Sequence, residues 1–135
     1  MKTTRNTDVE TVRAPADWAT GTVYMEPVAA PSPSGLGAAV MRFAPGARTV
    51  WHTHPRGQTI LVTDGLGRCQ RRDGPIETVS AGDAITFGPG EEHWHGATSD
   101  RYVAFLDMQE ADASGSPVTW GESVTDEQYA AASLS

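Results

Sequence analysis

The chain has 135 residues, a length that fits one domain with its own hydrophobic core. Its 17 acidic and 10 basic residues give a formal net charge of -7, which argues against nucleic acid or an anionic membrane as a partner. Cys69 is the single cysteine, so an intramolecular disulfide is excluded and a reducing compartment fits. We find no apolar N-terminal segment and no apolar run of membrane length, and we expect a cytoplasmic protein without membrane contact.

The N-terminal part of the chain is polar and weakly patterned. Residues 1–12 are expected to form a flexible arm, followed by a single domain over residues 13–135. Weak alternation of apolar and polar residues over 14–28 favours an edge strand. The Pro/Ser/Gly-rich segment 30–35 is typical of a loop.

The central part of the chain predicts a series of short strands. Gly, Pro, Asp or Ser punctuates nearly every gap between them, which indicates an all-β sandwich or barrel. One helix is expected near the C-terminus, over 124–132, because Thr125 and Gln128 form a capping-box pattern. The predicted strands cover residues 38–44, 49–54, 58–64, 67–73, 76–81, 83–88, 93–98 and 101–109.

All four histidines occur in two H-x-H pairs, His52 with His54 and His93 with His95. Side chains alternate along a strand, so both members of a pair face the same side. One such pair is common at a surface or in a hydrogen bond, but two pairs together with Gln58 indicate a metal site. Three neutral imidazole nitrogens and an amide oxygen suit a divalent first-row metal with open positions for a substrate. An amide in place of a carboxylate leaves the site more positive and the metal a stronger Lewis acid.

The spacing around these residues resembles the two motifs of the cupin family. The pattern Gly46-x5-His52-x-His54-x3-Gln58-x6-Gly65 resembles the first motif, with glutamine where glutamate is usual. The pattern Gly82-Asp83-x6-Gly90-x2-His93 resembles the second motif, with Gly88 where proline is common. The resemblance implies a double-stranded β-helix, which is a small jelly-roll barrel open at one end.

Four segments are more specifically similar to the bacterial manganese-dependent cupin hydroxynitrile lyases: PADWATGTV, PGARTVWHTHPRGQT, GPGEEHWHGA and VTDEQY. This similarity covers most of residues 15–129 and implies an enzyme that cleaves or forms cyanohydrins. It also implies one divalent metal ion per chain, expected to be Mn²⁺, with Fe²⁺, Ni²⁺ and Zn²⁺ as alternatives. The implied metal ligands are His52, His54, Gln58 and His93, and the implied pocket positions are Ala39, Met41, Thr49, His95 and Gln109.

One position departs from that family. The related lyases carry a histidine implicated in proton transfer on the strand where this chain has Phe105. Strand alternation puts Phe105, Asp107 and Gln109 on one face, so Phe105 and Asp107 are expected to line the same pocket. The proton carrier is then expected to be His95, the histidine left over from the ligand set, with Gln109 and Thr49 as hydrogen-bond donors in catalysis.

Residues outside the pocket have simpler interpretations. Trp51 and Trp94 have the opposite strand parity to the histidines and are expected to pack away from the cavity. Arg48 is expected to be a surface salt-bridge partner that contributes little to stability.

Two other classes of function stay open at this point. Cupin barrels host many reactions, so an oxygenase or a cyclase/isomerase of secondary metabolism is one alternative, and a non-catalytic small-molecule binder is the other. In each case the expected ligand is a small hydroxylated or carbonyl compound. We also expect a homo-oligomer, a dimer or a tetramer, in which the N-terminal arm adds to a neighbour's sheet edge.

Overall fold

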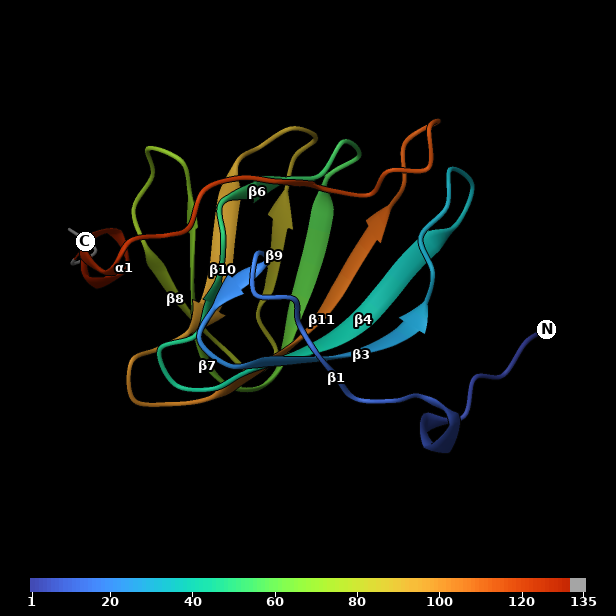
Figure 1. Ribbon diagram of the computed structural model, residues 1–135, viewed down its shortest axis with the longest axis horizontal. Helices are drawn as coiled ribbons and strands as arrows, with labels where there is room; N and C mark the ends of the chain where they lie inside the picture. The colour runs from blue at the N-terminus through green and yellow to red at the C-terminus, as the bar shows by residue number, and fades with distance from the viewer. Residues whose placement is uncertain (132–135) are drawn as a thin grey trace.

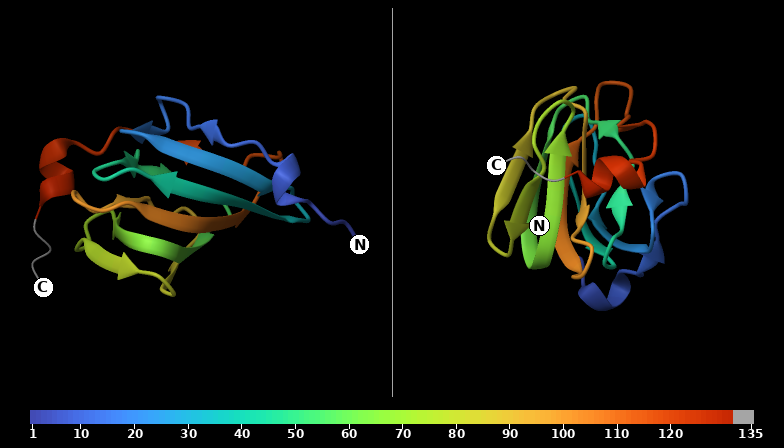
Figure 2. Two further views of the ribbon diagram at one scale, coloured as in Figure 1. Left: turned by 90° about the horizontal axis from the view of Figure 1, so that it is seen from below. Right: turned by 90° about the vertical axis from the view of Figure 1, so that its left-hand side faces the viewer.

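Two antiparallel β-sheets face each other and curl into a barrel in the computed structural model, which describes residues 1–131 (Figures 1 and 2). A short 3-10 helix, η1 (Asn6–Asp8), precedes the sheets. The first sheet contains β1 (Val12–Arg13), β3 (Val23–Ala29), β4 (Leu36–Phe43), β11 (Val103–Glu110), the first half of β7 (Gln58–Arg71) and β9 (Ala84–Phe87). The second contains β2 (Ala19–Thr20), β5 (Arg48–Thr49), β10 (His93–Ala97), the second half of β7, β8 (Glu77–Ser80), β6 (His52–Thr53) and β12 (Thr119–Trp120).

The long strand β7 joins the two sheets. Its first half pairs with β11 and β9, and its second half pairs with β10 and β8. The strand turns from one sheet to the other at Gly65, which has a φ of 81°. A Cβ atom at this position would overlap the carbonyl oxygen of Tyr102, so the bend requires glycine. The all-β barrel expected from the sequence is therefore confirmed.

Each predicted strand region contains a strand, with some differences in their limits. The runs 58–64 and 67–73 merge into β7, and the run 49–54 splits into β5 and β6. The strands β1 and β12 were not predicted, and β1 pairs with β3 of its own chain. The four residues 132–135 of the predicted domain lie outside the described residues, as does the last residue of the predicted helix. Association with a second copy stays a prediction.

The helix α1 (Asp126–Ala130) begins with the predicted capping box. The Thr125 hydroxyl accepts from the backbone N–H of Gln128 at 3.0 Å, and the Gln128 side chain accepts from the backbone N–H of Thr125 at 2.9 Å. Within residues 1–131, no helix is long and apolar enough to cross a membrane.

Apolar side chains form two separate clusters. The first fills the barrel below the cavity and contains Val23, Phe43, Ala47, Ile60, Val62, Cys69, Val79, Phe87, Ala97, Val103 and Phe105. The second packs between α1 and the second sheet and contains Trp51, Ile76, Trp94, Val124 and Tyr129. Trp51 and Trp94 thus lie away from the cavity, as their parity predicted.

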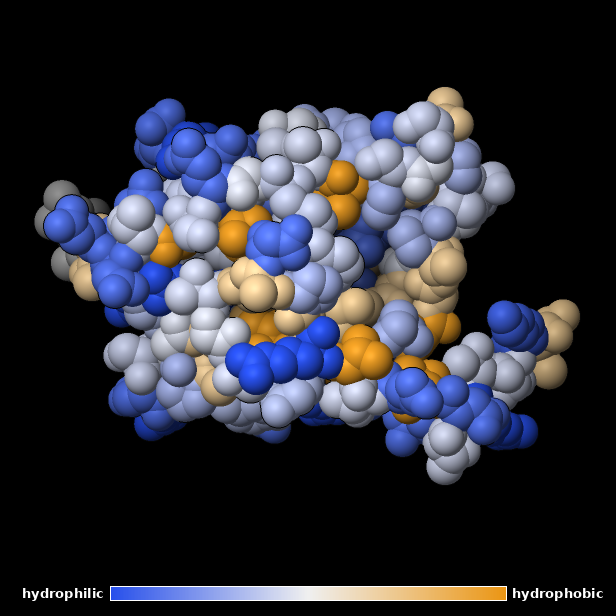
Figure 3. All heavy atoms as spheres, in the orientation of Figure 1, coloured by the Kyte–Doolittle hydropathy of each residue, from blue (hydrophilic) through white to orange (hydrophobic). Residues whose placement is uncertain are grey.

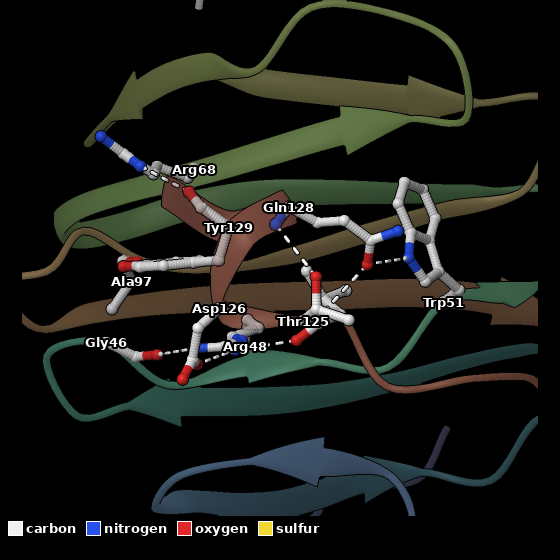
Figure 4. A network of polar contacts seen from close by, with 10 residues as sticks. Gly46, Arg48, Trp51, Arg68, Ala97, Thr125, Asp126, Gln128 and Tyr129 are labelled. Atoms are coloured by element: carbon white, nitrogen blue, oxygen red, sulfur yellow. Dashed lines mark hydrogen bonds and ion pairs between the residues drawn. The ribbon is translucent and has the colours of Figure 1, made fainter. Parts of the chain in front are cut away.

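The prediction for Arg48 is wrong, because its side chain is only 7% exposed and holds α1 against the barrel (Figure 4). Its guanidinium donates to the Val124 carbonyl at 2.7 Å and to the Asp126 carboxylate at 2.8 Å. It also lies over the Tyr129 ring, 4.6 Å from the ring centre. Helix α1 covers a charged residue that the local sequence places on the surface.

Candidate metal centre

A cavity of about 330 Å³ opens between the two sheets, and a hollow bordered by apolar atoms is visible on the face shown in Figure 3. Its outer wall is apolar and its floor is polar, a combination typical of small-molecule sites. The apolar wall consists of Trp18, Met25, Pro27, Ala29, Ala30, Pro31, Ala38, Ala39, Met41, Pro117, Val118 and Trp120. The polar lining consists of Thr49, His52, His54, Gln58, His95, Asp107 and Gln109.

Backbone carbonyl groups hold three of the histidines through the same ring nitrogen. The Nδ1 atom of His52 lies 2.8 Å from the Val50 oxygen, that of His54 lies 2.8 Å from the Pro117 oxygen, and that of His93 lies 2.9 Å from the Glu91 oxygen. A carbonyl oxygen can only accept, so Nδ1 carries the proton in each ring and Nε2 keeps its lone pair. A hydrogen bond of this kind commonly fixes the tautomer and the orientation of a metal-binding histidine.

The same three histidines are held in the neutral form. Burial lowers the pKa of His93 to about 3, with a smaller contribution from His95. Burial also lowers the pKa of His52 well below its ordinary value and that of His54 to a lesser extent. Metal ions bind the neutral imidazole, so these rings are ready for a cation at neutral pH.

The position of the Gln58 side chain is the clearest indication that this site binds a cation. Its amide nitrogen donates to the side-chain oxygen of Gln109 at 2.9 Å, which turns the Gln58 oxygen toward the histidines. That oxygen lies 2.9 Å from Nε2 of His93. Both atoms carry lone pairs and neither carries a proton, because His93 is neutral and protonated on Nδ1. Two unprotonated acceptor atoms at this distance are compatible with a cation bound between them or beside them.

The imidazole ring of His54 also has a nitrogen available for a ligand. Nε2 of His54 is buried and has no hydrogen-bond partner among the described residues, an arrangement that costs free energy unless something binds it. Three imidazole nitrogens and one amide oxygen therefore fit a divalent first-row metal, with positions left over for a ligand.

His95 offers an alternative third ligand. One side-chain nitrogen each from His52, His93 and His95 lie within 4.8 Å of one another, close enough for one ion. However, Nε2 of His95 lies 2.9 Å from the Asp107 carboxylate, to which it donates a hydrogen bond. The hydrogen-bonding pattern thus separates His95 from the three histidines that are anchored to backbone carbonyls.

Most of the predicted pocket positions meet in the cavity. Ala39, Met41, Thr49, Asp107 and Gln109 all line it, although they come from three different strands, and His95 lies beside them.

Phe105 does not line the cavity, contrary to the expectation from strand parity. It is fully buried in the core behind His95, with 5.1 Å between the ring centres. The β11–β4 register runs without interruption from Val103 to Glu110, so Phe105 keeps the strand parity of Asp107, but its ring packs in the core against Phe43 and His95.

One side of the cavity is formed by two tryptophan side chains, Trp18 and Trp120, which the sequence did not predict to line it. Trp18 and Trp120 stack with 4.8 Å between their centres, and the Trp120 ring lies 5.0 Å from that of His52. Trp18 lies next to β2 and Trp120 in β12, about 100 residues apart in the chain, so no local pattern links them. Their indole groups give one side of the cavity a flat apolar surface.

Comparison with known proteins gives a family match and a named relative. The family model described as "Cupin domain" matches residues 39–109, a stretch that runs from β4 to β11. A relative named (R)-mandelonitrile lyase, from Granulicella tundricola, is 50% identical over 118 residues, which are 87% of this chain and 89% of the relative.

Solved structures share the fold. A cupin-like protein from Thermotoga maritima superposes with a TM-score of 0.81 at 32% identity, covering 90% of this chain and 92% of that one. A polyketide cyclase from Streptomyces resistomycificus gives a TM-score of 0.68 at 26% identity, covering 96% of this chain and 90% of that one.

Proposed function

Because the chain belongs to the cupin family, we propose that it is a metal-dependent hydroxynitrile lyase. The reaction cleaves a cyanohydrin into an aldehyde and hydrogen cyanide, or forms the cyanohydrin in reverse. The observation that carries the proposal is the set of three histidines anchored through Nδ1, with Gln58, beneath an apolar cavity. The 50% identity to a protein named (R)-mandelonitrile lyase supports this choice of reaction class.

His52, His54, Gln58 and His93 would hold the metal, and we expect Mn²⁺, with Fe²⁺, Ni²⁺ or Zn²⁺ as alternatives. A bound divalent ion would act as a Lewis acid toward an oxygen of the substrate. The amide ligand adds no negative charge, so the site would keep the full positive charge of the ion.

The polar residues around the ligands have hydrogen-bonding capacity for a substrate. The Thr49 oxygen accepts the backbone N–H of His95 at 3.2 Å, which leaves its own proton free to be donated. The Gln109 oxygen accepts from Gln58, which leaves its amide nitrogen to donate to a nitrile or an oxyanion. The apolar wall excludes water from these groups and strengthens their interactions.

The test is cyanide release from racemic mandelonitrile as a function of bound metal. The protein is stripped with a chelator and reloaded with Mn²⁺, and metal content and cyanide are measured on the same samples. We expect cyanide release to rise in proportion to bound metal and to be lost in His52→Ala. A fully metal-loaded protein that releases no cyanide above the protein-free background would overturn the proposal.

A further inference from the structure

Asp107 is a buried carboxylate that lines the cavity, and the metal ligand set does not use it. Its side chain is 8% exposed, and one of its oxygens accepts the His95 hydrogen bond at 2.9 Å. The other oxygen, Oδ1, is buried and has no partner among the described residues. An unpaired carboxylate oxygen in such a place costs free energy unless a ligand donates a hydrogen to it.

Few groups in the cavity can accept a proton. Apart from the histidines assigned to the metal, the titratable residues that line it within residues 1–131 are His95 and Asp107. No lysine, glutamate, tyrosine or cysteine belongs to this described lining. A proton acceptor for the substrate must therefore come from this pair or from a ligand outside the chain.

The two members of the pair have different surroundings. His95 is 1% exposed, and the edges of Phe43 and Phe105 pack around its ring at centre distances of 5.7 Å and 5.1 Å. Its Nε2 proton points at Asp107. Nδ1 of His95, like Oδ1 of Asp107, is buried without a partner among the described residues, but the two phenylalanines hold the imidazole ring in place as the donor that orients the carboxylate.

We propose that Asp107 is the residue that accepts the proton of the substrate hydroxyl and that His95 positions it. This inference rests on the proposed lyase function. The hydroxyl proton moves to Oδ1 of Asp107, and the O–H electron pair forms the carbonyl group of the aldehyde. The bond to the nitrile carbon breaks with its electron pair on cyanide. The carboxylic acid then returns the proton to cyanide, which leaves as hydrogen cyanide and restores the carboxylate.

The kinetic test uses Asp107→Asn in the metal-loaded protein. Asparagine has nearly the same shape, and its oxygen can still accept from His95, but it cannot take a proton. We expect kcat for mandelonitrile to fall about 100-fold or more, the usual contribution of a general base, and KM to rise about tenfold because the hydrogen bond from the substrate hydroxyl to Oδ1 is lost. Metal content and thermal midpoint should match the unmodified protein. Asp64→Asn, which changes an exposed carboxylate on β7, is the matched control and should keep the parent kcat.

The affinities of two non-reacting ligands test the role of Asp107 even if the protein does not turn over mandelonitrile. Benzyl alcohol can donate a hydrogen to Oδ1, whereas benzaldehyde has only an acceptor. We expect Asp107→Asn to weaken benzyl alcohol about tenfold and benzaldehyde not at all, because a hydrogen bond to a charged group is lost for the alcohol alone. Equal affinity changes for the two ligands, or a kcat within about threefold of the parent, would overturn the assignment of Asp107.

The role of His95 is tested by two substitutions. Glutamine can donate to Asp107 as the imidazole does, whereas leucine cannot. We expect His95→Gln to lose less of kcat than His95→Leu, with similar KM values for both. If the two variants lose kcat equally while Asp107→Asn retains it, His95 is the proton acceptor and our proposal is wrong. If the unmodified protein releases no cyanide but the alcohol binds through Asp107, the proposed lyase function fails and the proton-accepting site stands.

Discussion

Single hydrogen bonds determine what each histidine can do. His52, His54 and His93 each give their Nδ1 proton to a backbone carbonyl, so the second nitrogen is free to bind a metal. His95 gives its Nε2 proton to Asp107 and lies outside this pattern. Four residues of one type, in two identical sequence pairs, thus divide by hydrogen bonding into three with Nδ1 anchored to a backbone carbonyl and one that donates from Nε2 to Asp107.

Metal content distinguishes these roles. We expect His54→Ala to retain less than half an equivalent of Mn²⁺, because it removes one of four ligands, whereas His95→Ala should keep close to one equivalent. The measurement is elemental analysis of both variants after dialysis against the same Mn²⁺ buffer. Loss of metal from His95→Ala with retention in His54→Ala would favour the alternative group of His52, His93 and His95.

The lowered histidine pKa values predict how the metal-free protein responds to acid. Between the unfolded pKa of about 6.5 and the folded pKa of about 3 for His93, the unfolded chain binds a proton that the folded chain does not. Stability must therefore fall as the pH falls through this window, and His52 and His54 act in the same direction. We expect a loss of about 3 kcal/mol from His93 between pH 6.5 and pH 4.

The measurement is urea unfolding of the chelator-treated protein at a series of pH values. A His93→Gln variant is the control and should show a shallower pH dependence, because it lacks this titrating group. A stability that stays constant or rises from pH 6.5 to pH 4 would contradict the neutral state assigned to the histidines.

At the scale of elements, the strand order brings distant segments together around the cavity. The proposed metal ligands come from β6 and the residue that follows it, from the start of β7 and from β10, while β12 supplies Trp120 to one side of the cavity. Trp120 stacks on Trp18 and faces the His52 ring. This wall is well placed to hold an aromatic ring of a substrate next to the metal ligands.

Removal of the Trp120 indole should therefore affect aromatic substrates selectively. We expect Trp120→Ala to raise KM for mandelonitrile about tenfold, in line with the loss of one aromatic contact and its buried area. KM for acetone cyanohydrin should change less than about threefold, because this substrate has no ring. Trp18→Phe preserves an aromatic surface and is the control. An equal increase of KM for both substrates would contradict a role in recognising the ring.

Helix α1 makes a different prediction, about stability alone. The Tyr129 hydroxyl donates to the carbonyl of Ala97 at 2.6 Å in a buried position (Figure 4). Tyr129→Phe leaves that carbonyl without this partner, and we expect it to lower the free energy of unfolding by about 1 to 2 kcal/mol. Tyr102→Phe removes a similar hydroxyl from an exposed pair with Asp64 and should cost less than about 0.5 kcal/mol. Comparable losses in the two variants would show that Tyr129 does not hold the helix through this hydrogen bond.

Local patterns predicted the strands but not their three-dimensional partners. Regular turn residues define the strand limits, so each predicted strand region proved to contain a strand. Gly65 looked like a break between two strands and is instead a bend within β7, because only tertiary structure shows the sheet on either side. Arg48 was wrongly predicted to lie at the surface because the helix that buries its side chain, α1, begins 78 residues later in the chain.

The site was predictable to the same extent. The H-x-H spacing and the family resemblance indicated the ligand candidates, since these depend on strand alternation. The hydrogen bond between His95 and Asp107 joins β10 to β11, which lie on opposite sides of β7, and no sequence rule pairs them. Strand alternation likewise does not show whether the ring of Phe105 reaches the cavity or stays in the core, because that depends on contacts with Phe43 and His95 from other strands.

For the whole molecule, the buried polar atoms at the cavity lower the free energy of unfolding, and a bound metal ion would raise it by pairing with them. Four polar side chains meet beneath it, and the buried nitrogen of His54 has no partner there among the described residues. The proposed ligands lie in or next to three strands, and one of these strands, β7, takes part in both sheets. An ion bound to the folded state alone stabilises it by mass action, so metal binding and global stability must be coupled.

Metal removal should accordingly lower the thermal midpoint of the whole protein. At a free Mn²⁺ concentration about 100 times the Kd, the expected stabilisation is about 2.7 kcal/mol, or an increase of roughly 5–15 °C for a chain of this length. Calorimetry of chelator-treated and reloaded protein measures the difference. His52→Ala is the control, and its midpoint should be the same with and without Mn²⁺, because the ion has lost its site. A midpoint of the unmodified protein that does not change with Mn²⁺ would mean that the histidines and Gln58 do not bind the ion in the folded state.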